Sequence, residues 1–472
     1  MDVRTELFID GAWVKPARSE LKDVVNPATE EIAGRFPLAG AADVDRAVDA
    51  ARRAFPAWSA RPLTERLQFL QALHDLFAEG SEDLAQRTTA EMGAPITFAR
   101  EFMTGLTIKA IARTIEIARD YPHETRSDGT LFIREAFGVV GVITPWNNPA
   151  FMSIIKVIPA LAAGCTIIHK PAENTPFDAY FLAEKIDKAG FPNGVYNLVT
   201  GTGSEVGEAI DGHAGLDLLS FTGSTGAGRR IAELAARVPT PAIMELGGKS
   251  ASIILDDADL EAAVRDSIPR VFMNAGQLCG SWTRLLVPRA KLAQAAEQTA
   301  ALANAFQLGD PLDPTTQMGP LVSAKQHKTV TDYIRVGLSE GARLVAGGMD
   351  RPAHLARGHY VPPTIFTDVK NTMRIAREEI FGPVLCLIPY EGDDEAVAIA
   401  NDSDYGLHGG VFSGDAERGL RVARRIRTGQ VHLNGFKFDL DVPFGGYRRS
   451  GYGRCLGPIG YEEYLQKKAI RL

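Results

Sequence analysis

The sequence predicts an α/β protein with two doubly wound parallel-sheet domains and a small β-extension. Short apolar runs alternate with amphipathic helical stretches over most of the chain, which is typical of crossover units that cover both faces of a parallel sheet. The length of 472 residues suits about three domains of roughly 150 residues each. A composition of 45% hydrophobic and 23% charged residues is that of an ordinary globular protein.

The chain begins with a predicted hairpin and a set of packing helices. Residues 7–14, with the sequence LFIDGAWV, fit two short strands about a turn at Asp10 and Gly11. Residues 41 to about 92 have the apolar spacing of amphipathic helices.

Two blocks of alternating strands and helices follow. In the first, predicted strands occupy residues 138–145, 165–170, 195–199, 216–223 and 241–248, and predicted helices occupy residues 151–163, 176–189, 225–237 and a segment after residue 207. The second block, from about residue 251 to residue 434, has predicted strands at residues 251–255, 283–287, 342–348 and 384–390. Residues 128–137 and the tail 461–472 predict extra strands, appended to the two domains, that could pair across subunits.

Charge and hydropathy exclude several classes of function. The formal charge of −7 is mild and no long run of like charges occurs, so neither nucleic acid nor an anionic membrane is favoured as a partner. The N-terminus has no apolar signal-peptide region, and the longest apolar run, residues 157–168, is too short to span a bilayer. We expect a soluble protein that acts on a small or medium-sized metabolite.

The cysteines favour a reduced, cytoplasmic setting. They are far apart in the sequence and form no CxxC or Cys/His cluster, so neither a metal site nor a disulfide framework is indicated. They are Cys165, Cys279, Cys386 and Cys455.

Two loops are candidates for nucleotide binding. FTGSTGAG puts Gly223, Gly226 and Gly228 between an apolar strand and a helix start, where free backbone N–H groups favour a phosphate, although such turns often serve packing alone. In HKPAEN, Lys170 and Glu173 lie at the carboxyl end of a strand, where open α/β sheets bind ligands. A glutamate there can bind two ribose hydroxyls and repels a 2′-phosphate, which favours NAD over NADP. The alternative for this pair is a surface ion pair.

Three further residues are candidates for catalysis. Glu245 in MELGGKS ends an apolar strand, where partial desolvation would raise its pKa into the range of a general base; the alternative is a surface glutamate at a strand end. Asn147 in TPWNNP has an amide that could stabilise an oxyanion, although an asparagine next to prolines is more often a plain turn residue. Cys279 in NAGQLCGSW is either a nucleophile or a buried apolar residue.

The motifs together resemble those of the aldehyde dehydrogenase superfamily. PWNNP, KPAEN, FTGSTGAG, MELGGKS, NAGQLC, EEIFGPV and VPFGGYRRSG occur in that family's order and at its approximate spacing, over nearly the whole chain. The resemblance implies NAD-dependent oxidation of an aldehyde to the carboxylic acid through a thiohemiacetal and a thioester on Cys279. It also implies that Glu245 is the general base and that Asn147 supplies the side-chain half of the oxyanion hole.

The resemblance also implies a domain division and an NAD site. A Rossmann-like NAD-binding domain would comprise residues 1–115 and 139–246, a catalytic domain residues 247–440, and an oligomerisation segment residues 116–138 and 441–472, in a homodimer or homotetramer. The residues implied at NAD are Ile143, Thr144, Pro145, Trp146, Lys170, Glu173, Gly203, Phe221, Gly223, Ser224, Leu246, Gly247, Glu379 and Phe381.

One departure concerns proton release. Cys455 stands where the family usually has a glutamate, which with the lysine matched by Lys156 is often proposed to pass the base's proton to solvent. Lys156 is present but the carboxylate is not, so the sequence does not identify the route by which Glu245 loses its proton; Cys455 is either part of that route or a buried spacer.

Family position also implies the substrate tunnel. Mostly apolar walls, without an arginine or lysine for an ω-carboxylate, favour a medium-sized alkyl, terpenoid or aromatic aldehyde. The implied wall residues are Asn148, Phe151, Met152, Ile155, Met273, Leu278, Trp282 and Phe438.

Other activities stay open on the sequence alone. One alternative is an enzyme of the same superfamily that prefers NADP or transfers the acyl group to coenzyme A, although retention of Glu245 favours hydrolysis. Another is a thiol esterase without a nucleotide, which the two nucleotide loops disfavour. A third is a non-catalytic relative, which joint retention of Cys279, Glu245 and Asn147 disfavours.

Overall fold

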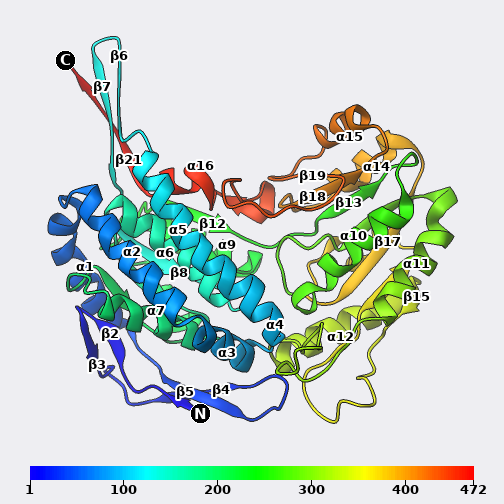
Figure 1. The fold of residues 1–472 in the computed structure, drawn as a ribbon, viewed down its shortest axis with the longest axis horizontal. Helices are drawn as coiled ribbons and strands as arrows, with labels where there is room; N and C mark the ends of the chain where they lie inside the picture. The colour runs from blue at the N-terminus through cyan, green and yellow to red at the C-terminus, as the bar shows by residue number, and fades with distance from the viewer.

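The computed structural model describes residues 1–472 and has two large sheets, each covered by helices (Figure 1). The first sheet has the strand order β20-β12-β11-β8-β9-β10-β2-β3. Its five central strands are parallel, and antiparallel strands close both edges. The central strands are β8 (Val139–Ile143), β9 (Thr166–Lys170), β10 (Tyr196–Leu198), β11 (Leu218–Thr222) and β12 (Ala242–Glu245), and the edge strands are β2 (Leu7–Ile9), β3 (Ala12–Val14) and β20 (Gly451–Tyr452).

Helices cover both faces of this sheet, so its strands are apolar throughout. Val140 and Val142 point into the core beneath α6 (Pro149–Ala163), whereas Val139 and Ile168 point into the core beneath α1 (Ala41–Ser59), as the two-residue period of a strand requires. The helices of this part of the chain are α1 (Ala41–Ser59), α2 (Leu63–Glu79), α3 (Ser81–Met92), α4 (Ile96–Phe98), α5 (Gly105–Asp120), α6 (Pro149–Ala163), α7 (Phe177–Lys188), α8 (Glu208–Asp211) and α9 (Thr225–Ala235).

The second sheet has the strand order β15-β16-β17-β14-β13-β18-β19 and is parallel except at β15. The predicted fold class is therefore confirmed. Its strands are β13 (Ala251–Ile254), β14 (Arg284–Pro288), β15 (Arg343–Ala346), β16 (Thr364–Thr367), β17 (Val384–Tyr390), β18 (Gly409–Phe412) and β19 (His432–Leu433). Its helices are α10 (Leu260–Phe272), α11 (Leu292–Asn304), α12 (Ala324–Ser339), α13 (Arg374–Arg377), α14 (Gly392–Asn401) and α15 (Ala416–Ala423).

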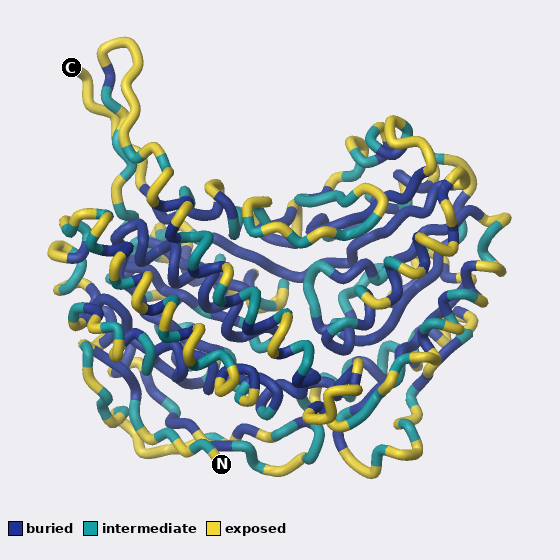
Figure 2. The backbone as a smooth tube through the Cα atoms, viewed as in Figure 1, coloured by how far each residue is buried: buried dark blue, intermediate teal, exposed yellow.

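The extra strands form a separate arm. β6 (Glu124–Ser127), β7 (Thr130–Ala136) and β21 (Leu465–Arg471) make a three-stranded sheet that projects from the body, and its tip is exposed (Figures 1 and 2). β21 pairs along its whole length with β7 of the same chain. The first residues of the predicted tail strand instead belong to α16 (Gly457–Glu462).

Two features of the ends of the chain differ from the prediction. Residues 441–472 do not all belong to the arm, because β20 within them pairs with β12 at the edge of the first sheet. A small sheet of β1 (Asp2–Val3), β5 (Ile32–Pro37) and β4 (Leu21–Val25) was not predicted from the sequence. No helix combines the length and apolar composition needed to cross a membrane.

Candidate active site

Cys279 lies in a tight loop between α10 and β14. The chain turns through left-handed conformations at Asn274, Ala275 and Gly276, with φ values of 54°, 54° and 71°. Gly276 has to be glycine, because a Cβ there would lie 2.2 Å from the carbonyl oxygen of Gly382. Gln277 holds the loop from both sides: its Oε1 accepts from the Val322 N–H at 2.9 Å and its Nε2 donates to the Asn274 carbonyl at 3.0 Å.

Asn147 is tied directly to this loop. It follows β8, and its Nδ2 donates to the Gln277 carbonyl at 3.0 Å. The Asn274 Nδ2 in turn donates to the Asn147 carbonyl at 2.8 Å. Two segments far apart in the sequence are thereby fixed together, and the second Asn147 amide hydrogen remains available for a ligand.

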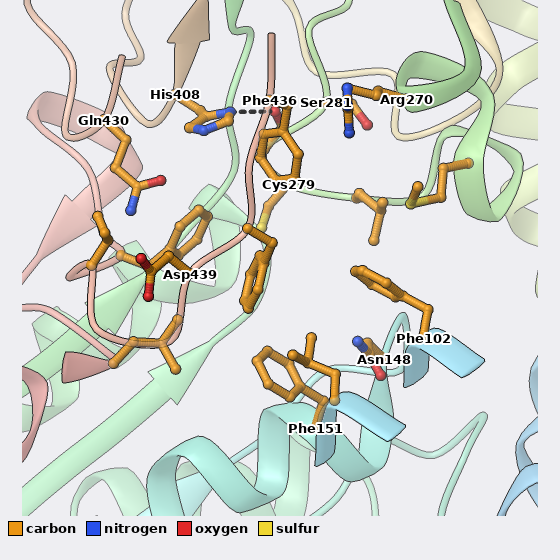
Figure 3. Close-up of a pocket in the computed structure, with 18 of the residues that line it drawn as sticks. Phe102, Asn148, Phe151, Arg270, Cys279, Ser281, His408, Gln430, Phe436 and Asp439 are labelled. Atoms are coloured by element: carbon orange, nitrogen blue, oxygen red, sulfur yellow. Dashed lines mark hydrogen bonds between the residues drawn. The ribbon is translucent and has the colours of Figure 1, made fainter. Parts of the chain in front are cut away.

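Cys279 separates two cavities of different character. Together with Asn147 and Met152, it lines both an apolar cavity (Figure 3) and a more polar one. The polar cavity also contains residues from the ends of β11 and β12 and from the loop after α13. A thiol and an amide in a shared wall can act on a molecule in one cavity while a second molecule occupies the other.

Glu245 lies at the end of β12 and lines the polar cavity with Cys279. It is 4% exposed, and neither carboxylate oxygen has a hydrogen-bond partner. Burial raises its pKa to about 8, and the nearby Cys279 thiol and Lys156 ammonium oppose part of the rise. Such a carboxylate is a suitable general base near neutral pH.

The Cys279 side chain is only partly accessible to solvent. Its enclosure by protein atoms, and next the charge of Glu245, raise the pKa of the thiol well above its usual value. The resting cysteine is therefore protonated, and a base has to accept the thiol proton before or as the sulfur attacks.

The polar cavity fits a dinucleotide. Ser224 caps α9, its Oγ accepting from the Ala227 N–H at 3.2 Å, and a Cβ at Gly226 would meet no atom within 4 Å, so the start of the helix is open to a phosphate. Across the cavity the Gly248 N–H donates to Glu379 Oε1 at 2.9 Å. A Cβ at Gly247 would lie 2.0 Å from Glu379 Oε2, so this glycine makes room for the carboxylate.

Lys170 and Glu173 lie at the carboxyl end of β9. Burial lowers the pKa of Lys170 to about 8, and its Nζ donates to the Pro171 carbonyl at 2.9 Å. The Gly203 N–H donates to Glu173 Oε1 at 2.9 Å, and Lys22 forms an ion pair with Oε2. In the protein alone, Lys170 and Glu173 therefore both bond to neighbouring groups.

A model of the aldehyde dehydrogenase family matches residues 13–470. The chain belongs to this family. As an aldehyde dehydrogenase it is an oxidoreductase that acts on aldehydes.

Three similar proteins illustrate the relationship. A 3-succinoylsemialdehyde-pyridine dehydrogenase of Pseudomonas sp. is 46% identical over 466 residues, which cover 98% of each chain. The geranial dehydrogenase of Castellaniella defragrans is 42% identical over 473 residues, covering 99% of this chain and 98% of the relative. The crystal structure of a mutant aldehyde dehydrogenase C of Pseudomonas syringae, in complex with NAD+ and octanal, is 45% identical and superposes with a TM-score of 0.98, covering 99% of this chain and 96% of that chain.

The structure gathers many of the residues that the sequence singled out. All eight predicted substrate residues line the apolar cavity with Cys279. Half of the predicted NAD residues line the polar cavity, namely Pro145, Trp146, Gly223, Ser224, Gly247, Glu379 and Phe381. The other half lie outside its lining, namely Ile143, Thr144, Lys170, Glu173, Gly203, Phe221 and Leu246.

One expectation about the apolar cavity was wrong. Arg270 and Lys437 both line it, although no arginine or lysine was expected there. Arg270 is held by Asp266 in a two-bond ion pair at 2.8 and 3.1 Å, and its guanidinium lies over the Phe436 ring. Still, 14 of the 24 lining residues are hydrophobic, so the cavity is an apolar tunnel with charge in one wall.

Sequence reasoning missed part of this wall. Residues such as Phe102, His408, Gln430 and Phe436 also line it (Figure 3). Ligands are sought at the carboxyl ends of parallel strands, whereas His408 directly precedes β18, at the amino end of that strand in the second sheet. The active site therefore lies between the carboxyl end of one sheet and the amino end of the other.

Lys156 and Cys455 are in contact, as their positions in the family implied. Lys156 is fully buried, and its Nζ lies 3.3 Å from Ser220 Oγ, 3.4 Å from the Phe221 carbonyl and 3.8 Å from Cys455 Sγ. Burial raises the pKa of the Cys455 thiol, so the sulfur is neutral. A thiol that accepts from Lys156 thus occupies the place of the family's carboxylate.

Proposed function

We propose that this enzyme oxidises an aldehyde to the carboxylic acid with NAD, through a covalent intermediate on Cys279. The observation that carries the proposal is the position of Cys279 and Asn147 in the wall between the two cavities, with Glu245 buried beside them. The apolar cavity suits the aldehyde and the polar cavity suits the dinucleotide.

The first step forms a bond between Cys279 Sγ and the aldehyde carbon. Glu245 removes the thiol proton, directly or through a water molecule, and the sulfur adds to the carbonyl. The oxyanion that results is stabilised by the free Asn147 amide hydrogen and by the Cys279 backbone N–H. Because Asn147 is already anchored on Gln277, it needs no reorganisation to donate.

When NAD is bound, its nicotinamide would accept a hydride from the thiohemiacetal carbon. The thiohemiacetal on Cys279 would thereby become a thioester. Glu245 releases the thiol proton to solvent and then removes a proton from water, and the water oxygen attacks the thioester carbon. The bond to Sγ breaks, the carboxylic acid leaves, and the Cys279 thiolate takes back the proton that Glu245 holds. Glu379 and Phe381, in the wall of the polar cavity, would hold the nicotinamide ribose and ring.

The choice of NAD over NADP rests on Glu173. Its carboxylate, anchored by Gly203, would bind the ribose hydroxyls and repel a 2′-phosphate. Lys170 would contact the dinucleotide on the same side as Glu173. Gly223 and Ser224, at the start of α9, would contact the pyrophosphate.

The substrate class follows from the apolar tunnel. Aromatic and aliphatic side chains such as Phe151, Met152 and Leu278 suit a medium-sized alkyl, terpenoid or aromatic aldehyde. The octanal complex and the geranial dehydrogenase among the similar proteins support this class.

The domain division predicted from the sequence is part of this proposal, and each domain has a role in it. Residues 1–115 and 139–246 would bind NAD, residues 247–440 would carry the nucleophile, and the arm formed by β6, β7 and β21 within residues 116–138 and 441–472 would bridge subunits in a homodimer or homotetramer. The projecting arm with exposed Phe132 and Leu472 supports such bridging. Free cysteines, one of them the nucleophile, suit a reduced cytoplasm.

A screen of aldehydes tests the proposal. The wild-type enzyme is assayed for NADH or NADPH formation with short-chain, long-chain, terpenoid, aromatic and ω-carboxy aldehydes, with and without coenzyme A, and the acid product is quantified. We expect NADH and free acid without coenzyme A, and no turnover in Cys279→Ala. Turnover of none of these aldehydes by the wild-type enzyme would refute the proposal; acyl-CoA formation or NADP preference would correct it.

A further inference from the structure

A lysine of the small N-terminal sheet contacts the carboxylate that we assign to the ribose of NAD. Lys22 shares the inner face of β4 with Val24, which is buried, while the residues beside and between them are exposed. The alternation of the strand therefore directs Lys22 toward the first-sheet part of the protein. There its Nζ forms an ion pair with Glu173 Oε2.

The Glu173 carboxylate is charged and retains free acceptor positions. Burial would raise its pKa, but the hydrogen bonds from Lys22 and from the Gly203 N–H outweigh this effect, and the pKa lies below its usual value. The two donors use two of the roughly four lone-pair positions of a carboxylate, so two ribose hydroxyls can still donate to it. The side chains of Lys22 and Glu173 are 40% and 27% exposed, so a ligand can reach both.

The polar cavity extends to this ion pair. Asn174, the residue after Glu173, lines the cavity. A Cβ at Gly203, whose N–H holds Glu173, would meet no atom within 4 Å, so the space beside this anchor is open. A dinucleotide in the polar cavity therefore has room for its ribose at Glu173.

Two ammonium groups surround this one carboxylate. Burial lowers the pKa of Lys170 to about 8, and the charges that act on Lys170 are first that of Glu173 and then, with opposite sign, that of Lys22. The three groups thus form a cluster of two cations and one anion. A phosphate monoester has a charge of about −1.5 to −2 at neutral pH. Glu173 repels such a group, whereas Lys22, in contact with the same carboxylate, attracts it.

We propose that Lys22 is a specificity-determining residue of the dinucleotide site: it neutralises Glu173 and donates to a 2′-phosphate, so that the enzyme binds NADP as a second, weaker cofactor. The inference rests on the proposed function, because it concerns the NAD site of the same enzyme. It deepens that function, since Glu173 sets the preference for NAD and Lys22 limits the size of the preference. With NAD, Lys22 would keep its ion pair with Glu173; with NADP, it would turn to the phosphate.

Equilibrium binding tests this role without turnover. The wild type and Lys22→Met are titrated calorimetrically with NADH and with NADPH in the absence of aldehyde. We expect the wild type to bind both, NADH more tightly. In Lys22→Met the Kd for NADPH should rise on the order of 10-fold, because a charge-assisted hydrogen bond is lost, while the Kd for NADH should change less than about threefold. The difference should shrink in high salt, which screens an exposed charge.

Two further variants separate the position of the charge from its presence. Lys22→Arg keeps the cation and should keep most of the affinity for NADPH. Lys370→Met removes an exposed lysine between β16 and α13 and should leave both Kd values unchanged. An unchanged ratio of the two Kd values in Lys22→Met, or an equal rise in both, would overturn the proposal and leave NAD binding intact. Failure of the wild type to bind either dinucleotide would overturn the proposed function as well.

Discussion

The stability of Glu245→Gln relative to the wild type should increase progressively as the pH rises from about 5 to about 9. The carboxyl group is buried without a hydrogen-bond partner, and burial raises its pKa from 4.5 to about 8. The folded protein therefore retains a proton that the unfolded chain loses between these pH values. Below pH 4.5 the group is neutral in both states, whereas above pH 8 its charge costs free energy only in the folded state.

The magnitude follows from the two pKa values. A rise in the pKa of Glu245 from 4.5 to about 8 destabilises the folded protein by about 5 kcal/mol at a pH where the carboxyl group is ionised in both the folded and the unfolded state. Solvent in the adjoining cavity reduces this value, so 5 kcal/mol is an upper limit. Glutamine has the same shape and no charge. Its buried amide adds an unfavourable contribution that does not change with pH, so the prediction concerns the slope with pH and not the absolute difference.

Thermal unfolding of the wild type and of Glu245→Gln at intervals between pH 5 and pH 9 measures this slope. The difference in Tm, variant minus wild type, should become more positive by several degrees across the range. Glu297→Gln, an exposed substitution on α11, is the control and should give a flat difference. A flat or falling difference for Glu245→Gln would show that the carboxylate is already ionised at low pH, and the assignment of Glu245 as a neutral-pH base would be lost.

Three further predictions concern catalysis. Asn147→Ala should lower kcat by roughly 10²- to 10³-fold in steady-state assays, because one oxyanion donor is lost; a smaller change than threefold would place the oxyanion elsewhere. Glu173→Gln should raise kcat/KM for NADP relative to NAD, because repulsion of the 2′-phosphate is removed, and an unchanged ratio would mean that another residue discriminates between the dinucleotides. Cys455→Glu should change the pH profile of acid formation by placing a carboxylate beside Lys156; an identical profile would exclude position 455 from proton release.

Most of the fold could be predicted because its strands are buried on both faces. Short, mostly apolar runs such as residues 139–143 and 251–254, each followed after a turn by a helical stretch, are typical of strands in a covered parallel sheet. The short strands at the edges of the sheets were harder to predict from the sequence. β20 has two residues, and its pairing with β12 depends on where the preceding loop returns, which no local pattern encodes.

The candidate site was predicted unevenly for a similar reason. Residues at the ends of first-sheet strands, such as Glu245 and Gly223, have a local signature, an apolar strand followed by glycines, and at Gly223 a helix start follows as well. Arg270 has no such signature. It lies in the last turn of α10, and its place in the cavity wall depends on the packing of Phe436 from a remote segment. The sequence therefore indicated an apolar tunnel and missed the polar side chains in its wall.

Trp282 illustrates how such a wall is built from coupled residues. Its indole has space only because residue 410 is glycine, where a Cβ would lie 2.9 Å from the Trp282 ring. The indole N–H is satisfied only because His408, two residues before that glycine, accepts from it. The bulk of Trp282, the space at Gly410 in β18 and the acceptor at His408 Nδ1 are thus one arrangement. Trp282 alone predicts a purely apolar wall, whereas its hydrogen bond to His408 shows that the wall also contains a buried polar pair.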